Sequence, residues 1–167
     1  MFKIILSIFI SITFSFASKS LLVSMPVNYK MDYTKDTMCL VRHLKVYKDP
    51  KWVAKVQLQN DKKVFFSSPK SMFEFYFRPG KWFDVGVKNE QDFKYIIVTD
   101  YATLKPINAK NAYFVYGSSI TSPAGDDLVA FSSEQKAKDF AKKNNGKRVF
   151  RFTEVSDALI RLINGRI

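Results

Sequence analysis

The predicted order strand–strand–helix–strand occurs twice along this chain, and no other feature limits its fold so strongly. The first copy has an alternating strand at 52–59, a strand at 64–66, a helix ending near Phe77 and a buried strand at 95–98. The second copy has strands and a helix in the same order, at 112–116, 128–131, about 132–143 and 149–152, followed by a last helix from about Thr153. This order predicts an α+β protein built from two ββαβ units.

Matches at a fixed distance support a duplication. Phe66-Ser67-Ser68 recurs 65 positions later as Phe131-Ser132-Ser133, and Phe75 recurs as Phe140. Ser68-Pro69 predicts a helix start, with a capping hydroxyl before proline at the first helical position. In the second copy, Ser132 and Gln135 have the spacing of a capping box. Chance similarity between two hairpin-to-helix corners is the alternative explanation.

The start of the chain predicts a secretory signal peptide. An apolar run from Ile4 to Phe16 follows a positive residue and precedes small residues suited to cleavage. It is shorter than the roughly 20 residues of a membrane span, although an uncleaved anchor is the alternative. No cysteine stands directly after the run, so we expect a periplasmic protein with no lipoprotein cysteine and no stable membrane anchor after cleavage. The expected division is a signal peptide at 1–17, an irregular segment with a candidate metal site at 18–50, a first unit at 51–105, and a second unit with a C-terminal helix at 106–167.

Composition excludes several kinds of site. A single cysteine cannot form an intramolecular disulfide. One cysteine and one histidine together cannot supply the four ligands of a structural zinc site. The net charge of +12 can simply reflect a solvated basic surface. It would also suit an acidic partner or a membrane surface, whereas export argues against nucleic acid. A cysteine–histidine nucleophilic pair is arithmetically possible, yet no oxyanion-hole motif accompanies it. We therefore expect no enzyme and no catalytic residues.

Several short motifs occur together in the second half: Val98-Thr99-Asp100-Tyr101, Ile107-Asn108-Ala109, Ala112-Tyr113-Phe114-Val115, Thr121 to Gly125, Leu128-Val129-Ala130-Phe131 and Asn145-Gly146-Lys147. Upstream, Cys39 is followed by a polar stretch and then by Pro50, Lys51 and Ala54. In these residues the chain resembles the NosL family. The resemblance implies a fold of two ββαβ units. It also implies a periplasmic copper(I)-binding accessory protein of nitrous oxide reductase, whose partner would be a periplasmic copper enzyme or copper-delivery protein.

The chain departs from the family at two motifs. The family's cysteine segment typically reads Cys-Gly-Met, whereas this chain has Cys39-Leu40-Val41. The family's later loop reads Thr-Pro-Met-Gly, whereas this chain has Ser122-Pro123-Ala124-Gly125. The cysteine is kept and both accompanying thioethers are absent, which indicates a divergent member. Organomercurial lyases resemble this fold too, but their chemistry depends on more than one cysteine.

The candidate metal ligands are Cys39, Met38 and His43. Copper(I) is a soft ion that accepts thiolate, thioether and imidazole groups. Cys39 and His43 would share one face of either a helix or an extended strand. Alternatively, Cys39 is a small buried core residue, His43 a surface or capping histidine, and Met38 an ordinary packing residue. Two functions follow: a copper(I)-carrying accessory protein, or a periplasmic interaction module that keeps the fold and has lost the metal site.

Overall fold

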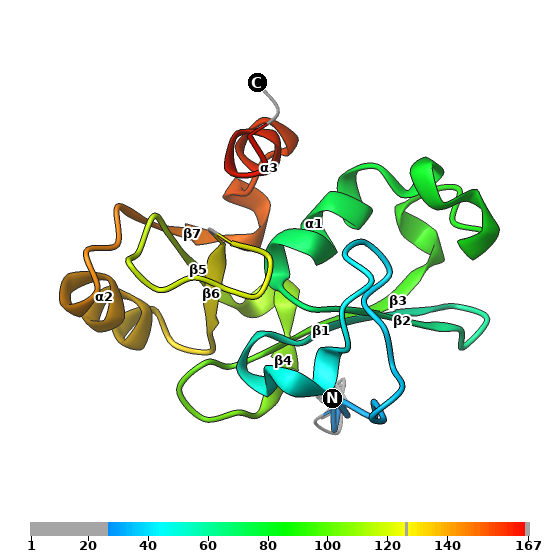
Figure 1. Cartoon of the computed structure of the whole chain (residues 1–167), viewed down its shortest axis with the longest axis horizontal. Helices are drawn as coiled ribbons and strands as arrows, with labels where there is room; N and C mark the ends of the chain where they lie inside the picture. Colours follow the sequence, from blue (N-terminus) through cyan, green and yellow to red (C-terminus); the bar gives the residue numbers. More distant parts are fainter. Residues whose placement is uncertain (1–26, 126, 166–167) are drawn as a thin grey trace, which may run out of the picture.

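The computed structural model describes residues 27–125 and 127–165, so the expected signal peptide at 1–17 lies outside the described residues. Within that part of the chain there are two antiparallel sheets (Figure 1). The first has the order β2-β1-β3-β4, with β1 at Ala54–Leu58, β2 at Lys63–Phe66, β3 at Phe93–Thr99 and β4 at Pro106–Asn108. The second has the order β6-β5-β7, with β5 at Tyr113–Tyr116, β6 at Leu128–Phe131 and β7 at Arg148–Arg151.

Three α-helices accompany the sheets in the described residues: α1 at Pro69–Phe77, α2 at Glu134–Lys143 and α3 at Asp157–Ile163. Short 3-10 helices lie in the connections, at Val46–Lys48, Pro50–Trp52, Pro79–Val85, Glu90–Asp92, Ala109–Asn111 and Phe152–Glu154. No helix in residues 27–125 and 127–165 has both the length and the apolar character that a membrane crossing requires.

The two sheets share one topology, which confirms the two ββαβ units. In each unit the first strand lies in the middle, flanked by the second and third strands. The registers also correspond, because Ala54 at the start of β1 pairs with Phe66, as Tyr113 at the start of β5 pairs with Phe131. The first sheet gains β4, which pairs with β3, so this sheet continues past residue 105, where the sequence division ended the first unit.

The two units also share an aromatic contact between their second strand and their helix. Phe66 packs on Phe75 with ring centroids 5.5 Å apart, and Phe131 packs on Phe140 at 5.0 Å. Each pair joins the end of a unit's second strand to its own helix. The equivalence of these pairs, 65 positions apart, places the same aromatic contact at the same corner of both units.

Two sequence-based element starts were wrong. The capping residue of α2 is Ser133, whose hydroxyl accepts from the Lys136 N–H, because Ser132 instead donates its own N–H to the Asp100 carboxylate. The last helix begins at Asp157 behind a Ser156 cap, since Phe152–Glu154 first forms a separate 3-10 turn.

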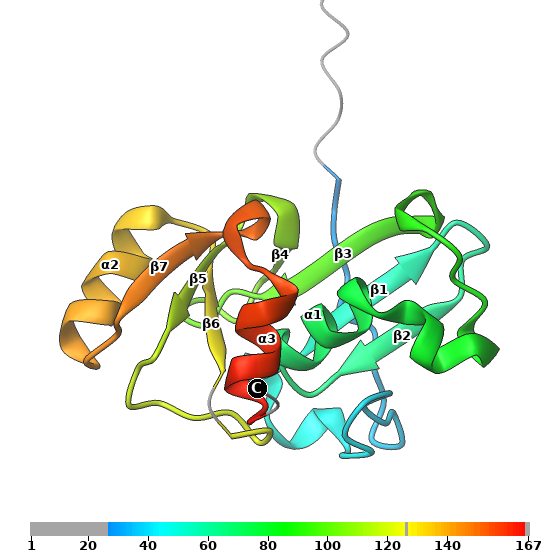
Figure 2. The same cartoon turned by 90° about the horizontal axis from the view of Figure 1, so that it is seen from above.

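The helix α1 lies between the two halves of the molecule. It contacts β1 and β2 of its own sheet, β6 of the other sheet, and α3 (Figure 2). Phe73 of α1 reaches the second sheet, with its ring 5.1 Å from that of Phe114. By contrast, α2 packs on β5, β6 and β7 of its own sheet. One hydrophobic core around α1 therefore joins both units.

Candidate metal site

The three predicted ligands lie in one tight loop, residues 38–45, which we call the cysteine loop. Met38 and Lys45 form an antiparallel bridge at its base. Inside this bridge the Cys39 N–H donates to the Leu44 carbonyl at 2.8 Å, and the His43 N–H donates to the Cys39 carbonyl at 2.9 Å. His43 takes a left-handed backbone conformation, with φ of 54°, and so reverses the chain direction. The segment is thus neither a helix nor a regular strand.

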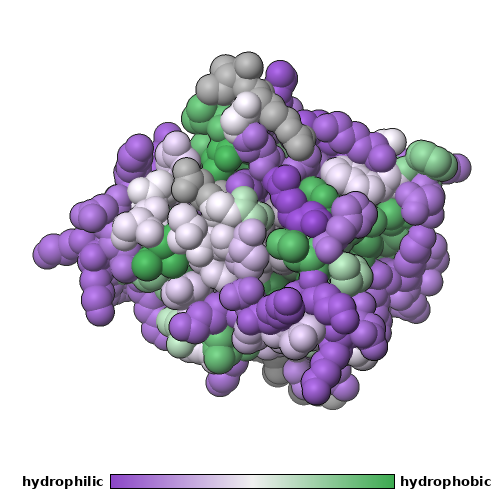
Figure 3. All heavy atoms as spheres, in the orientation of Figure 1, coloured by the Kyte–Doolittle hydropathy of each residue, from purple (hydrophilic) through white to green (hydrophobic). Residues whose placement is uncertain are grey.

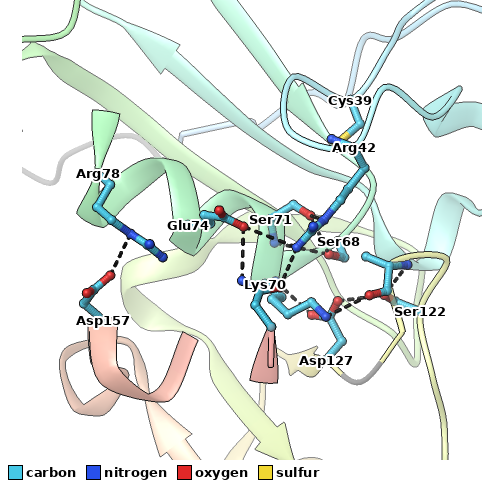
Figure 4. Close-up of polar contacts among 12 residues, drawn as sticks. Cys39, Arg42, Ser68, Lys70, Ser71, Glu74, Arg78, Ser122, Asp127 and Asp157 are labelled. Atoms are coloured by element: carbon cyan, nitrogen blue, oxygen red, sulfur yellow. Dashed lines mark hydrogen bonds and ion pairs between the residues drawn. The ribbon is translucent and has the colours of Figure 1, made fainter. Parts of the chain in front are cut away.

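Cys39 is held beneath this loop. Its side chain is 0% exposed and belongs to the main hydrophobic core. The residue forms a parallel bridge with Phe65 of β2, and the next N–H, of Leu40, donates to the Phe65 carbonyl. The Cys39 Sγ accepts the Arg42 N–H at 3.3 Å, as Figure 4 shows. The sulfur is therefore closed off from solvent by the chain that follows it.

Met38 and His43 lie on the surface of the same loop. Met38 is 44% exposed, and His43 is also exposed. Among the described residues, no three His, Cys, Asp or Glu side chains gather as a possible metal site. The structure thus places two soft donors at the surface and the thiol below them, joined through the backbone of one loop.

Sequence reasoning missed the polar network that covers this loop. The Arg42 Nη2 donates to the Glu74 carboxylate at 3.2 Å and to the Asn164 side-chain oxygen at 2.5 Å, and the Arg42 Nε donates to the Ser71 hydroxyl at 3.4 Å. The Asn164 amide in turn donates to Glu74 at 3.1 Å. One feature of the sequence could have indicated this network: Glu74 is an acidic residue within the apolar run 72–77 of a predicted helix, and a buried carboxylate needs polar partners.

The two cationic residues close to Cys39 in the sequence, Arg42 and Lys45, each lie beside an acidic side chain. Arg42 faces the buried Glu74, and Lys45 lies 3.4 Å from the Asp36 carboxylate. The Lys45 pair is exposed, so it contributes little energy. Their arrangement nevertheless weakens the repulsion that these cations would exert on a bound metal ion.

The 122–125 loop, which the family resemblance connects with the cysteine, lies near the cysteine loop. A cleft of about 120 Å³ between them is lined by Leu44, Val46, Pro123, Lys45, Lys48, Asp49 and Ser67. The Ser67 hydroxyl is buried there with no hydrogen-bond partner in the described part of the chain. The two loops whose family motifs this chain has changed are therefore neighbours.

The buried Asp127 fixes the 122–125 loop to α1. One of its carboxylate oxygens accepts the Lys70 N–H at 2.8 Å, and the other accepts the Ser122 hydroxyl at 2.7 Å. The Lys70 ammonium donates to the Ala124 carbonyl at 2.8 Å. Burial raises the pKa of the Asp127 carboxyl, and these donors offset part of that effect. The loop is thus anchored through α1, the helix that also holds Arg42 (Figure 4).

Comparison with solved structures identifies the fold. The crystal structure of the copper chaperone NosL from Shewanella denitrificans superposes with a TM-score of 0.67 at 23% identity, covering 80% of this chain and 99% of that one. The solution structure of apo-NosL from Achromobacter cycloclastes covers 64% of this chain and 87% of that one, with a TM-score of 0.45 and 24% identity. The first of these likenesses shows that the fold is the same.

Sequence comparison identifies the family. The copper-binding lipoprotein NosL of Stutzerimonas stutzeri is 43% identical over 54 residues, which span 32% of this chain and only 28% of that relative. The Shewanella and Stutzerimonas proteins are named as a copper chaperone and a copper-binding lipoprotein, not as enzymes, in agreement with the expectation for this chain. The sequence profile of NosL matches residues 30–160. This chain therefore belongs to the NosL family.

Proposed function

We propose that this protein carries copper(I) as cargo, with Cys39 as its thiolate ligand and Met38 and His43 as further ligands. One observation carries the proposal: a single loop of eight residues, 38–45, holds a thiol, a thioether and an imidazole. These are the groups that a soft monovalent ion prefers, and few of them suffice. Family membership supports copper as the metal, because a relative in this family is named as copper-binding.

The donor set fits copper(I) on one condition. The backbone N–H of Arg42 already points at the Cys39 sulfur, and such a donor stabilises negative charge on a thiolate. However, Cys39 is 0% exposed, while Met38 and His43 face solvent. A shared copper ion therefore requires the cysteine loop to move so that the sulfur reaches the surface donors.

The setting of this activity is proposed on the same basis. The signal peptide expected at 1–17 would deliver the mature chain to the periplasm. There it would pass copper to a periplasmic copper enzyme or receive it from a copper-delivery protein, in the role of an accessory to nitrous oxide reductase. The basic surface, from a net charge of +12, favours an acidic partner.

A second candidate function rests on the burial of Cys39. Cys39 is fully buried in the hydrophobic core, as expected for a cysteine whose role is only to fill space there. In that case the protein is a periplasmic interaction module that keeps the NosL fold without its metal. The two functions differ in whether the sulfur ever becomes a ligand.

Anaerobic titration with copper(I) against a competing chelator separates the two functions. The chain from residue 18 onward is compared with Cys39→Ala, Met38→Leu and His43→Gln. We expect the wild type to take copper from the chelator, Cys39→Ala to lose this ability, and the other two variants to weaken it. Met31→Leu is the matched control, because it removes a thioether that is not in the cysteine loop. Equal, poor competition by wild type and Cys39→Ala would instead support the interaction module.

A further inference from the structure

Three side chains from distant parts of the chain meet where the cysteine loop contacts α1 and the end of α3, and we call them the arginine clamp. They are Arg42 of the loop, Glu74 of α1 and Asn164 at the end of α3. Each pair among the three is joined by a hydrogen bond, at 3.2, 2.5 and 3.1 Å. The Glu74 side chain is 3% exposed and that of Arg42 is 24% exposed, so the ion pair is only partly screened by water.

Arg42 connects this clamp to the sulfur. Its side chain is fixed by α1 and α3, while its own backbone N–H donates to the Cys39 Sγ at 3.3 Å. The clamp thus restrains the residue whose backbone N–H lies against the sulfur, and release of the guanidinium removes that restraint. The loop is also held by the Arg42 Nε bond to the Ser71 hydroxyl, by its internal backbone bonds, by the Leu40 N–H bond to Phe65 and by the partly buried side chains of Leu40 and Val41.

We infer that Arg42 is a positioning residue, and that the arginine clamp holds the cysteine loop closed over the Cys39 sulfur until local release of the clamp exposes it. The role of this opening in copper loading rests on the proposed function. The opening itself is a property of the metal-free protein, so it can be measured without copper.

The surroundings of the clamp favour local opening over unfolding of the whole domain. The base of the loop is closed by the Met38–Lys45 bridge, whose Met38 and Lys45 side chains are substantially exposed. The third member of the clamp lies at the end of α3, a helix of 7 residues. Segments with few buried contacts open at a lower free energy than strands in the core. The sheets can thus stay intact while the loop lifts.

The single cysteine makes this opening measurable by thiol alkylation. The metal-free chain from residue 18 onward is treated with iodoacetamide, and the modified fraction is followed by mass spectrometry. Arg42→Ala should label faster than wild type by about tenfold or more, because hydrogen bonds to charged groups have effects of this order. Arg42→Lys keeps the charge but lacks the planar group that makes the three side-chain hydrogen bonds, so its rate should lie between those of wild type and Arg42→Ala.

Arg78→Ala is the matched control. Arg78 also joins α1 to α3, through a 2.9 Å ion pair with Asp157, and its side chain is 22% exposed, close to that of Arg42. It does not contact the cysteine loop through any hydrogen bond or ion pair found in the described residues. We expect Arg78→Ala to leave the labelling rate near that of wild type.

Urea dependence distinguishes local opening from global unfolding. Local opening exposes little surface, so labelling in low urea should rise much less steeply than the unfolding equilibrium measured on the same protein. If Arg42→Ala does not fold, Asn164→Ala removes another member of the clamp and should also speed labelling. Equal rates in wild type and clamp variants, an equal gain in Arg78→Ala, or labelling that follows global unfolding would each overturn the inference. Failure to bind copper with clamp-dependent labelling intact would reject the proposed function alone.

Discussion

The helices of the two units have the same topological place and opposite surroundings. Residues 69–75 of α1 are all buried, whereas Ala137 is the one buried residue in α2, all of whose residues the structure describes. Hydrophilic side chains cover the side of the molecule where α2 lies (Figure 3). The two units thus share their topology and the aromatic contact between second strand and helix, but the surroundings of their helices differ.

Two pairs of equivalent positions explain the difference. Phe73 of α1 corresponds to Lys138 of α2, 65 positions later. On the middle strands, the registers make Lys55 of β1 equivalent to Phe114 of β5. Phe73 packs on Phe114, so α1 contacts the second sheet, on the face that α2 does not cover, as well as its own sheet. We call the face of each sheet that its own helix does not cover the outer face. The two units pack together through the aromatic pair Phe73 and Phe114. The equivalent positions hold Lys138 and Lys55, so α2 and the first sheet have no such aromatic pair with which to add a further unit.

The largest effect is expected from breaking this contact. Phe73 is 0% exposed and lies within 5.1 Å, between ring centroids, of both Phe114 and Phe152. Phe73→Ala should lower the free energy of unfolding by about 3–5 kcal/mol, since it leaves a large cavity between the units. Urea denaturation of both proteins, followed by circular dichroism, measures the change.

The matched control is Lys138→Ala at the equivalent place in α2. It should change the free energy of unfolding by no more than about 0.5 kcal/mol, as surface substitutions usually do. Phe73→Leu keeps most of the apolar volume and should lie between the two. Similar losses for Phe73→Ala and Lys138→Ala would mean that α1 does not join the units in the way described.

The sequence predicted the elements well because their signals are local. Alternation indicated the strands, and Ser68-Pro69 indicated the helix start where Ser68 is observed to cap α1. The packing of one unit against the other could not be predicted from local signals, since an apolar helix face does not determine which surface will cover it. For the same reason the site was only partly predicted. The candidate ligands were found in one segment, but the clamp joins Arg42 to Asn164 across 122 positions, and no local pattern marks such a pair.

The second comparison concerns the outer faces of the two sheets. Phe114 faces the shared core, while its equivalent, Lys55, is 2% exposed beneath the segment that precedes the cysteine loop. The Lys55 ammonium donates to the Asp32 carboxylate at 2.7 Å and also to the Lys30 carbonyl. Partial burial would raise the pKa of Asp32, but hydrogen bonds with Lys55 and Lys63 hold it well below its usual 3.8.

Asp32→Asn should therefore cost about 1–2 kcal/mol at neutral pH, a value kept small because the carboxylate is 38% exposed and screened. A depressed carboxyl pKa stabilises the fold above the unfolded pKa and loses this effect as the pH falls through the folded pKa. The difference between wild type and Asp32→Asn should thus be constant above about pH 5 and shrink steadily in more acid solution. Urea denaturation across this pH range measures it.

The control for the acid titration is Asp36→Asn. Asp36 also pairs with a lysine, Lys45, but its side chain is 92% exposed and the contact is 3.4 Å long. We expect almost no change in stability, because exposed pairs contribute little. An equal loss of stability at neutral pH in both variants would show that the burial of Lys55 is not what makes Asp32 important.

The last comparison concerns the two helix caps, of which the cap of α2 should have the smaller effect. The Ser68 hydroxyl is fully buried and bonds both the N–H and the hydroxyl of Ser71 at 3.2 Å, whereas the Ser133 hydroxyl is partly exposed and accepts from the Lys136 N–H at 3.5 Å. Ser68→Ala should cost about 1–2 kcal/mol, and Ser133→Ala about 0.5 kcal/mol, because water can replace a lost cap only at the exposed helix end. Urea denaturation measures both. Equal losses would mean that the surroundings of α1 strengthen its packing but not its cap.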